Sequence, residues 1–261
     1  MSNTLSRKTI SPALQALLDR FIDYAGLFPP AKLPLDTCLT NFQSYATSDH
    51  KWMLRWFVLN ETDLSNTPEA MNGLLSILTE KDQNRAATLE TKSIVKAKHP
   101  VYCEVPCDIL SMLDEVKANG CFAKIRTGGI KEELIPSTKD VASFIERCAQ
   151  LRLAFKATAG LHHPIRAVYA LTYEPNSSKA TMHGFLNVLM ASAFAWHGME
   201  NVEAIVAETD PAAFSFDDSA KWRDKALTIS QVKDARANFI HAIGSCSFDE
   251  PVTELQALGL L

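Results

Sequence analysis

Glycine is scarce in this sequence, with 10 residues among 261, fewer than the 12 prolines. A basic excess is also absent, because 26 Lys and Arg residues face 30 Asp and Glu residues and leave a formal net charge of -4. Nucleic-acid binders usually carry a basic face, so we expect no nucleic-acid partner. Hydrophobic residues make up 47% of the chain, which excludes intrinsic disorder and allows a large core.

Long apolar runs and paired cysteine motifs are missing as well. The most apolar window, 185–196, falls short of the roughly 20 residues that span a bilayer, so we expect a buried helix and no membrane partner. Residues 1–8 are polar and lack the apolar core of a secretory signal. None of the six cysteines forms a C-x-x-C pair. The sequence therefore predicts reduced thiols and a cytoplasmic location.

Short β-prone segments alternate with helical stretches, which is typical of parallel βαβ units. Eight such units in a chain of this length predict a single (β/α)8 barrel of the TIM type, forming one domain over 1–261, with a doubly wound open sheet as the alternative. We expect an irregular segment, with a short helix, over 210–225. The expected strands are 21–25, 55–59, 86–92, 101–105, 122–126, 153–158, 202–207 and 239–243, and the expected helices are 35–48, 68–80, 108–119, 138–151, 181–198, 228–237 and 254–258.

Charged residues fall in or after these strands, where the loops of a barrel converge on one mouth. Lys124 lies in the fifth expected strand and Lys156 in the sixth, each among small and apolar neighbours. A buried lysine near a second cation has a lowered pKa, and its neutral amine can attack a carbonyl to form a Schiff base. Anion binding and an inner-barrel ion pair, for example with Glu104 of the fourth strand, remain alternatives for both lysines.

Glycine-rich loops follow both lysine strands. Thr127, Gly128 and Gly129 follow one strand and Gly160 follows the other, so backbone N–H groups beside Arg126 are expected to hold a phosphate or carboxylate of the substrate. Simple tight turns are the alternative. The chain has no P-loop or G-x-G-x-x-G motif, so a nucleotide ligand is not expected.

Two adjacent histidines follow the sixth expected strand. His162 and His163 suit proton transfer, and consecutive side chains in an extended segment point to opposite sides, so we expect one of them to face the mouth. We expect no cofactor. The alternative is a divalent metal held by one histidine, for which the following residues are candidate further ligands: Glu104, His183, Glu208 and Asp210. A structural hydrogen bond is the third interpretation.

Three further residues stand near expected strand ends. Asp23 could supply a carboxylate and Tyr24 a phenol to the first loop, or they serve as a helix cap and a core residue. Cys246 follows the last strand and is a candidate contact to the substrate, although a buried thiol of no chemical role is the simpler interpretation.

The segments AKIRTGG (123–129) and AFKATAGLHHP (154–164) resemble class I aldolases of the deoxyribose-phosphate aldolase type. The resemblance implies a (β/α)8 enzyme with two active-site lysines on neighbouring late strands, one forming the Schiff base and the other lowering its pKa. Together with DYAGLFPPA (23–31), these segments also resemble an uncharacterised bacterial family, which implies no function.

These observations predict a small-molecule enzyme of the lyase, aldolase or isomerase type that acts on an oxygenated, anionic carbonyl compound. A metal-dependent hydrolase or isomerase using His162 or His163 with carboxylates is the first alternative, and a non-catalytic ligand-binding barrel is the second. A small-molecule substrate is the expected partner, and a homo-oligomer is left open.

Overall fold

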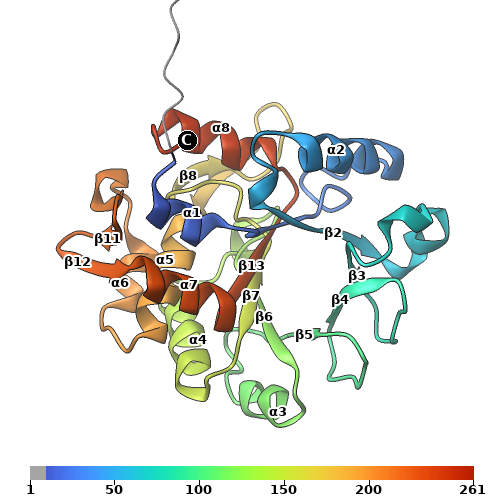
Figure 1. Cartoon of the computed structure of the whole chain (residues 1–261), viewed down its shortest axis with the longest axis horizontal. Helices are drawn as coiled ribbons and strands as arrows, with labels where there is room; N and C mark the ends of the chain where they lie inside the picture. Colours follow the sequence, from blue (N-terminus) through green and yellow to red (C-terminus); the bar gives the residue numbers. More distant parts are fainter. Residues whose placement is uncertain (1–9) are drawn as a thin grey trace, which may run out of the picture.

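Eight parallel strands close into a barrel in the computed structural model, which describes residues 10–261 (Figure 1). The chain forms a (β/α)8 barrel of the TIM type, as the alternation predicted, and not an open sheet. The expectation about the polar residues 1–8 lies outside the described residues. Around the barrel the strands are β1 (Ile22–Tyr24), β2 (Leu54–Asn60), β3 (Leu75–Leu78), β4 (Ala86–Thr91), β5 (Val101–Glu104), β6 (Phe122–Arg126), β7 (Phe155–Thr158) and β13 (Ile240–Ser245).

Helices cover the barrel unevenly. Figure 1 shows α4, α5, α6 and α7 gathered beside β6, β7 and β13, whereas β3 and β4 are flanked by loops and short 3-10 turns. The expectation that a helix follows every strand is therefore wrong for this half of the barrel. The helices are α1 (Pro12–Leu18), α2 (Leu35–Thr47), α3 (Met112–Ala118), α4 (Thr138–Leu151), α5 (Phe185–Trp196), α6 (Val202–Ala207), α7 (Ile229–Asn238) and α8 (Asp249–Ala257).

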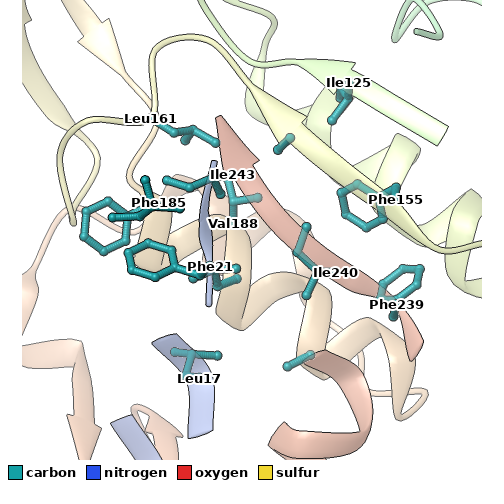
Figure 2. Packing of buried hydrophobic residues seen from close by; sticks show 14 of the residues in the cluster. Leu17, Phe21, Ile125, Phe155, Leu161, Phe185, Val188, Phe239, Ile240 and Ile243 are labelled. Atoms are coloured by element: carbon teal, nitrogen blue, oxygen red, sulfur yellow. The ribbon is translucent and has the colours of Figure 1, made fainter. Parts of the chain in front are cut away.

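The core lies between this helical side and the strands. Figure 2 shows Phe155 of β7 beside Phe239, whose rings meet edge to face at 5.1 Å between centroids. Phe185 at the start of α5 packs on Phe21 at 5.3 Å. All residues of α5 except Ala195 are buried, which explains its continuous apolar sequence. No helix among residues 10–261 is long and apolar enough to cross a membrane.

Two expected elements have the other secondary structure, so the barrel still has eight strands but their numbering along the chain changes. The expected helix 68–80 contains strand β3, which is hydrogen-bonded to β2 and β4 and is almost entirely buried. The expected strand 202–207 is helix α6, with Val202, Ile205 and Val206 buried at helical spacing. Lys124 and Lys156 consequently lie on the sixth and seventh barrel strands, β6 and β7, one position later than expected.

Additional strands lie outside the barrel. A hairpin of β8 (Ala167–Ala170) and β9 (Lys179–Met182) follows β7, where no strand was expected. The segment expected to be irregular instead forms a three-stranded antiparallel sheet, and the expected short helix is limited to a 3-10 turn (Pro211–Ala213). Its strands are β10 (Phe214–Phe216), β11 (Ser219–Trp222) and β12 (Lys225–Thr228).

Candidate active site

A cavity of about 260 Å³ opens at the C-terminal ends of the barrel strands. This end is where the loops of a (β/α)8 barrel form its active sites. Of the residues predicted for the site, Lys124, Arg126, Gly129, Gly160, His162 and Cys246 line it. The other lining residues are Ala25, Phe28, Pro29, Pro30, Val58, Leu78, Glu90, Ile130, Leu134, Thr158, Ala159, Leu171, Met182 and Gly244.

Strand register brings the charged side chains together inside the barrel. Glu104 of β5 is the Cα partner of Lys124, which is in turn the partner of Lys156. Because side chains alternate along a strand, both lysines point inward while Ala123, Ile125 and Ala157 do not. The sequence pattern of one lysine in a small, apolar strand reflects this geometry.

The inner side chains form one network of ion pairs. Lys156 Nζ lies 2.5 Å from Asp23 Oδ2 and 2.6 Å from Glu90 Oε1. Lys124 Nζ lies 3.1 Å from Glu90 Oε2 and 3.0 Å from Glu104 Oε2. Glu90 is therefore the shared carboxylate, with one oxygen for each lysine. The predicted ion pair of Lys124 with Glu104 exists as part of this larger network.

Glu90 was missed in the sequence, although it connects the whole network. It is 4% exposed and also accepts a hydrogen bond from Ser76 Oγ at 2.8 Å, and Ser76 accepts one from Thr88. Burial raises the pKa of this carboxyl, but Lys156 and Lys124 lower it more strongly, to about 2. In the segment AATLET (86–91), Glu90 is the one charged residue among small and apolar neighbours. The same pattern drew attention to the two lysines, and it would have identified Glu90 as well.

The two lysines differ in access to the cavity. Lys124 lines its wall, whereas Lys156 is 0% exposed and lies beneath it between Asp23 and Glu90. Burial lowers the pKa of Lys156, but the attraction of Asp23 and Glu90 outweighs burial and the net shift is upward. Lys156 therefore acts as a fixed internal cation, and Lys124 is the amine that a bound compound can meet.

The two glycine loops pack on each other at the rim. A Cβ at Gly128 would lie 3.1 Å from the Cα of Gly160, so glycine permits this close approach. Thr127 Oγ1 donates to the carbonyl of Ala159 at 2.8 Å. Gly160 and its neighbour Ala159 both adopt left-handed backbone, with φ of +75° and +66°. Neither Thr127 nor Gly128 lines the cavity, and both hold the two loops together.

The two histidines face different surroundings. His162 lines the cavity, and its Nδ1 lies 3.1 Å from Ser245 Oγ. His163 does not line it: the ring stacks on Tyr169 at 3.5 Å between centroids and its Nδ1 lies 2.6 Å from Glu254 Oε1. Burial, with a smaller contribution from His163, lowers the pKa of His162 to about 4. His162 is thus a neutral imidazole at pH 7.

The candidate metal ligands are dispersed. Glu208 accepts from Arg223 Nε at 2.9 Å and from Trp222 Nε1 at 3.1 Å, which fixes it at β11. His183 Nε2 contacts the carbonyl of Pro136 at 2.8 Å. Within residues 10–261 no group of three or more His, Cys, Asp or Glu side chains is placed to hold a metal ion.

Tyr24 and Cys246 have different positions. Tyr24 lies against α2 rather than in the cavity, and its OH accepts a hydrogen bond from Asn41 Nδ2 at 3.3 Å. Tyr24 does not line this cavity, because alternation along β1 turns Asp23 inward and Tyr24 outward. Cys246 Sγ lies 3.7 Å from His162 Nδ1, and burial raises the pKa of this thiol to about 11.

Buried histidines make stability depend on pH. Burial lowers the pKa of His162 to about 4, and burial with Arg55 and Arg236 lowers that of His241 to about 4. An unfolded imidazole binds a proton below about pH 6.5, whereas the folded one resists it. We expect the free energy of unfolding to be highest above pH 6.5 and to fall as the pH drops to 4, by up to about 3 kcal/mol per histidine.

Urea unfolding at several pH values from 7 to 4 would measure this dependence. His162→Gln removes one of the imidazoles whose pKa is lowered by burial, which also include His183, and should flatten the curve in that window. Below about pH 4.5 the stability contributed by Glu90 is lost as well, because its folded pKa lies at about 2. A constant free energy of unfolding between pH 6.5 and 4 would contradict the assignment of both imidazoles as neutral.

In comparisons with protein-family models and with curated proteins, nothing matches this chain.

Proposed function

We propose that this barrel is a Schiff-base enzyme of the aldolase-type lyase or isomerase class, acting on a small anionic carbonyl compound. The proposal rests on one observation: the amine of Lys124 stands on the cavity wall, bracketed by Glu90 and Glu104 at 3.1 and 3.0 Å. A cavity of about 260 Å³ suits a compound of few atoms. The proposed enzyme is cytoplasmic, in keeping with six free cysteines.

Lys124 would be the nucleophile. Its ammonium gives a proton to Glu104, whose side chain is 24% exposed, and the neutral amine then attacks the substrate carbonyl carbon. The hydroxyl of the resulting carbinolamine takes the proton back from Glu104 and leaves as water, and a protonated imine remains on Nζ. Glu90 and Glu104 hold a positive charge at this position in the free protein, and they would stabilise the iminium cation in the same way.

Lys156 and Glu90 would set the charge around that step. Because Lys156 lies 2.6 Å from Glu90 and 2.5 Å from Asp23, its charge balances part of the negative charge inside the barrel. The role of Lys156 is thus to position and balance, not to react. In this proposal Lys124 reacts and Lys156 supports it, which matches the pair of one reacting and one assisting lysine that the resemblance to class I aldolases implies.

His162 would transfer a proton to or from the substrate, and Arg126 would bind its anionic group. His162 is neutral at pH 7 because its pKa is about 4, so it offers a free ring nitrogen for proton transfer within the cavity. Arg126 ends β6 on the rim of the same cavity and would attract an anionic group. Gly129 and Gly160 line the same cavity.

Borohydride trapping tests the proposal. The protein is incubated with small anionic aldehydes and ketones, such as glyoxylate and pyruvate, and reduced with sodium borohydride, which converts an imine to a stable amine. We expect one substrate-sized mass increase, mapped by peptide mass spectrometry to Lys124. Lys156 should stay unlabelled because it is 0% exposed.

The exposed Lys131, whose side chain is 67% exposed, reports non-specific labelling in the same digest. An adduct spread equally over Lys131 and other surface lysines, or no adduct with any carbonyl compound tried, would refute the covalent proposal.

A further inference from the structure

A second cavity opens at the opposite end of the barrel, with a volume of about 860 Å³. It is lined near the beginnings of β2, β5, β6 and β13 by Arg55, Tyr102, Phe122 and His241, and also by residues of α1 and α7. The ion network around Lys156 lies between this cavity and the one at the mouth. Nothing in the proposed reaction uses this second cavity.

Cationic side chains dominate its wall. Arg20, Arg55, Lys233 and Arg236 line the cavity, against one carboxylate, Asp19. Among residues 10–261 no ion pair joins Lys233 or Arg236 to a carboxylate within 4.0 Å. Arg55 is paired with Asp23 at 3.8 Å, so the excess of positive charge in the cavity comes from Arg20, Lys233 and Arg236 against Asp19.

The two inner arginines are fixed and incompletely bonded. Arg236 donates to the backbone carbonyls of Ile240 and Asp19, and its Nε has no hydrogen-bond partner. Arg55 Nη2 donates to Tyr102 OH at 3.3 Å, while its Nη1 has no hydrogen-bond partner and stays 3.8 Å from Asp23. These two nitrogens are buried, so an oxyanion in the cavity would meet the cationic groups that line it and not Arg236 Nε or Arg55 Nη1.

Aromatic rings hold the guanidinium groups in place. Arg20 and Arg55 lie 4.7 and 5.7 Å from the centroid of the Trp56 ring. Tyr102 OH is bonded to His241 Nδ1 at 2.7 Å, which fixes the neighbouring wall. A cation that is already oriented loses less conformational entropy when it binds an anion.

We infer that this cavity binds a small oxyanion of multiple negative charge, such as a diphosphate, which matches the excess of Arg20, Lys233 and Arg236 over Asp19. Guanidinium groups match phosphate oxygens in bidentate geometry, and the lysine adds a point charge. The cavity is larger than a diphosphate, so a ligand with a further organic part also fits beside Phe122. This site is distinct from the cavity at the mouth.

Isothermal titration calorimetry with inorganic pyrophosphate at low ionic strength tests the inference. We expect one saturable site in the full chain. The double variant Arg20→Ala/Lys233→Ala removes two exposed cations without opening the core, and it should weaken binding by about ten-fold or more. Arg236→Gln should weaken binding further, but it also removes hydrogen bonds to backbone carbonyls. The test therefore relies on Arg20→Ala/Lys233→Ala.

Two controls locate the site. Lys139→Ala/Lys179→Ala removes the same charge from exposed positions that line neither cavity and should leave the affinity unchanged. Arg126→Ala removes the cation of the mouth and should also bind normally. The inference is overturned by absence of binding up to about 10 mM pyrophosphate, by an equal loss in the Lys139/Lys179 variant, or by a loss in Arg126→Ala with none in Arg20→Ala/Lys233→Ala.

Discussion

Lys156→Met is expected to lower the free energy of unfolding by about 3–5 kcal/mol. The substitution fills a similar volume but leaves Asp23 and Glu90, which are 0% and 4% exposed, without their common cation. Glu90 keeps Lys124 at 3.1 Å and Asp23 keeps only Arg55 at 3.8 Å, so each buried carboxylate loses its closest cation and Asp23 loses most of its compensation. Urea denaturation at pH 7, followed by circular dichroism, would measure the change.

Two comparisons show that the effect comes from the uncompensated charge. Lys131→Met breaks an exposed ion pair, 3.9 Å from Glu133, and should change the free energy of unfolding by less than about 0.5 kcal/mol. Adding Asp23→Asn to Lys156→Met should restore part of the stability, because one buried charge disappears. If Lys156→Met were as stable as Lys131→Met, the ion network would contribute nothing to the fold.

Lys124→Arg is expected to abolish covalent trapping and to reduce turnover by about 10³-fold or more for whichever carbonyl compound forms the trapped adduct. A guanidinium is never deprotonated in proteins, so it cannot supply the attacking amine. It keeps a positive charge between Glu90 and Glu104, at the wall of a cavity that has room for the larger group. The midpoint of thermal unfolding should therefore change by only a few degrees.

Lys131→Arg is the matched control, since it makes the same chemical change at an exposed site and should retain full turnover and trapping. Steady-state kinetics and borohydride trapping on the three proteins would be compared side by side. Full turnover in Lys124→Arg would rule out an imine at this residue and assign the reaction to other groups of the cavity.

The fold class could be predicted because the hydrophobic pattern changes period along the chain, and this change is a local property. Individual elements were less certain. The segments LSIL (75–78) and VEAIVA (202–207) are short apolar runs, which suit a strand or a buried helix equally well. The place of each segment in the tertiary structure determines which of the two it forms. Strand β3 pairs with β2 and β4 inside the barrel, whereas α6 packs on α4 and α5.

The lysines of the candidate site were visible for a physical reason. A charged residue in an apolar strand violates the local pattern, and such a side chain needs a partner or a function. Glu104 could be named as a partner from the sequence, but the full set could not, because Asp23 and Glu90 come from strands that only the closed barrel brings to the two lysines. The placement of Tyr24 outside the cavity likewise depends on which face of β1 turns inward.

By itself, the sequence determined the alternation of strands and helices, the buried helix at 185–196 and the two inward lysines, since each of these follows from local polarity and spacing. Only the tertiary structure decided that Lys124 meets the cavity while Lys156 is sealed beneath it, that Glu90 joins them, and that cations gather at the far end. Those features depend on barrel register and closure, which place residues 34 to 133 positions apart within hydrogen-bonding distance.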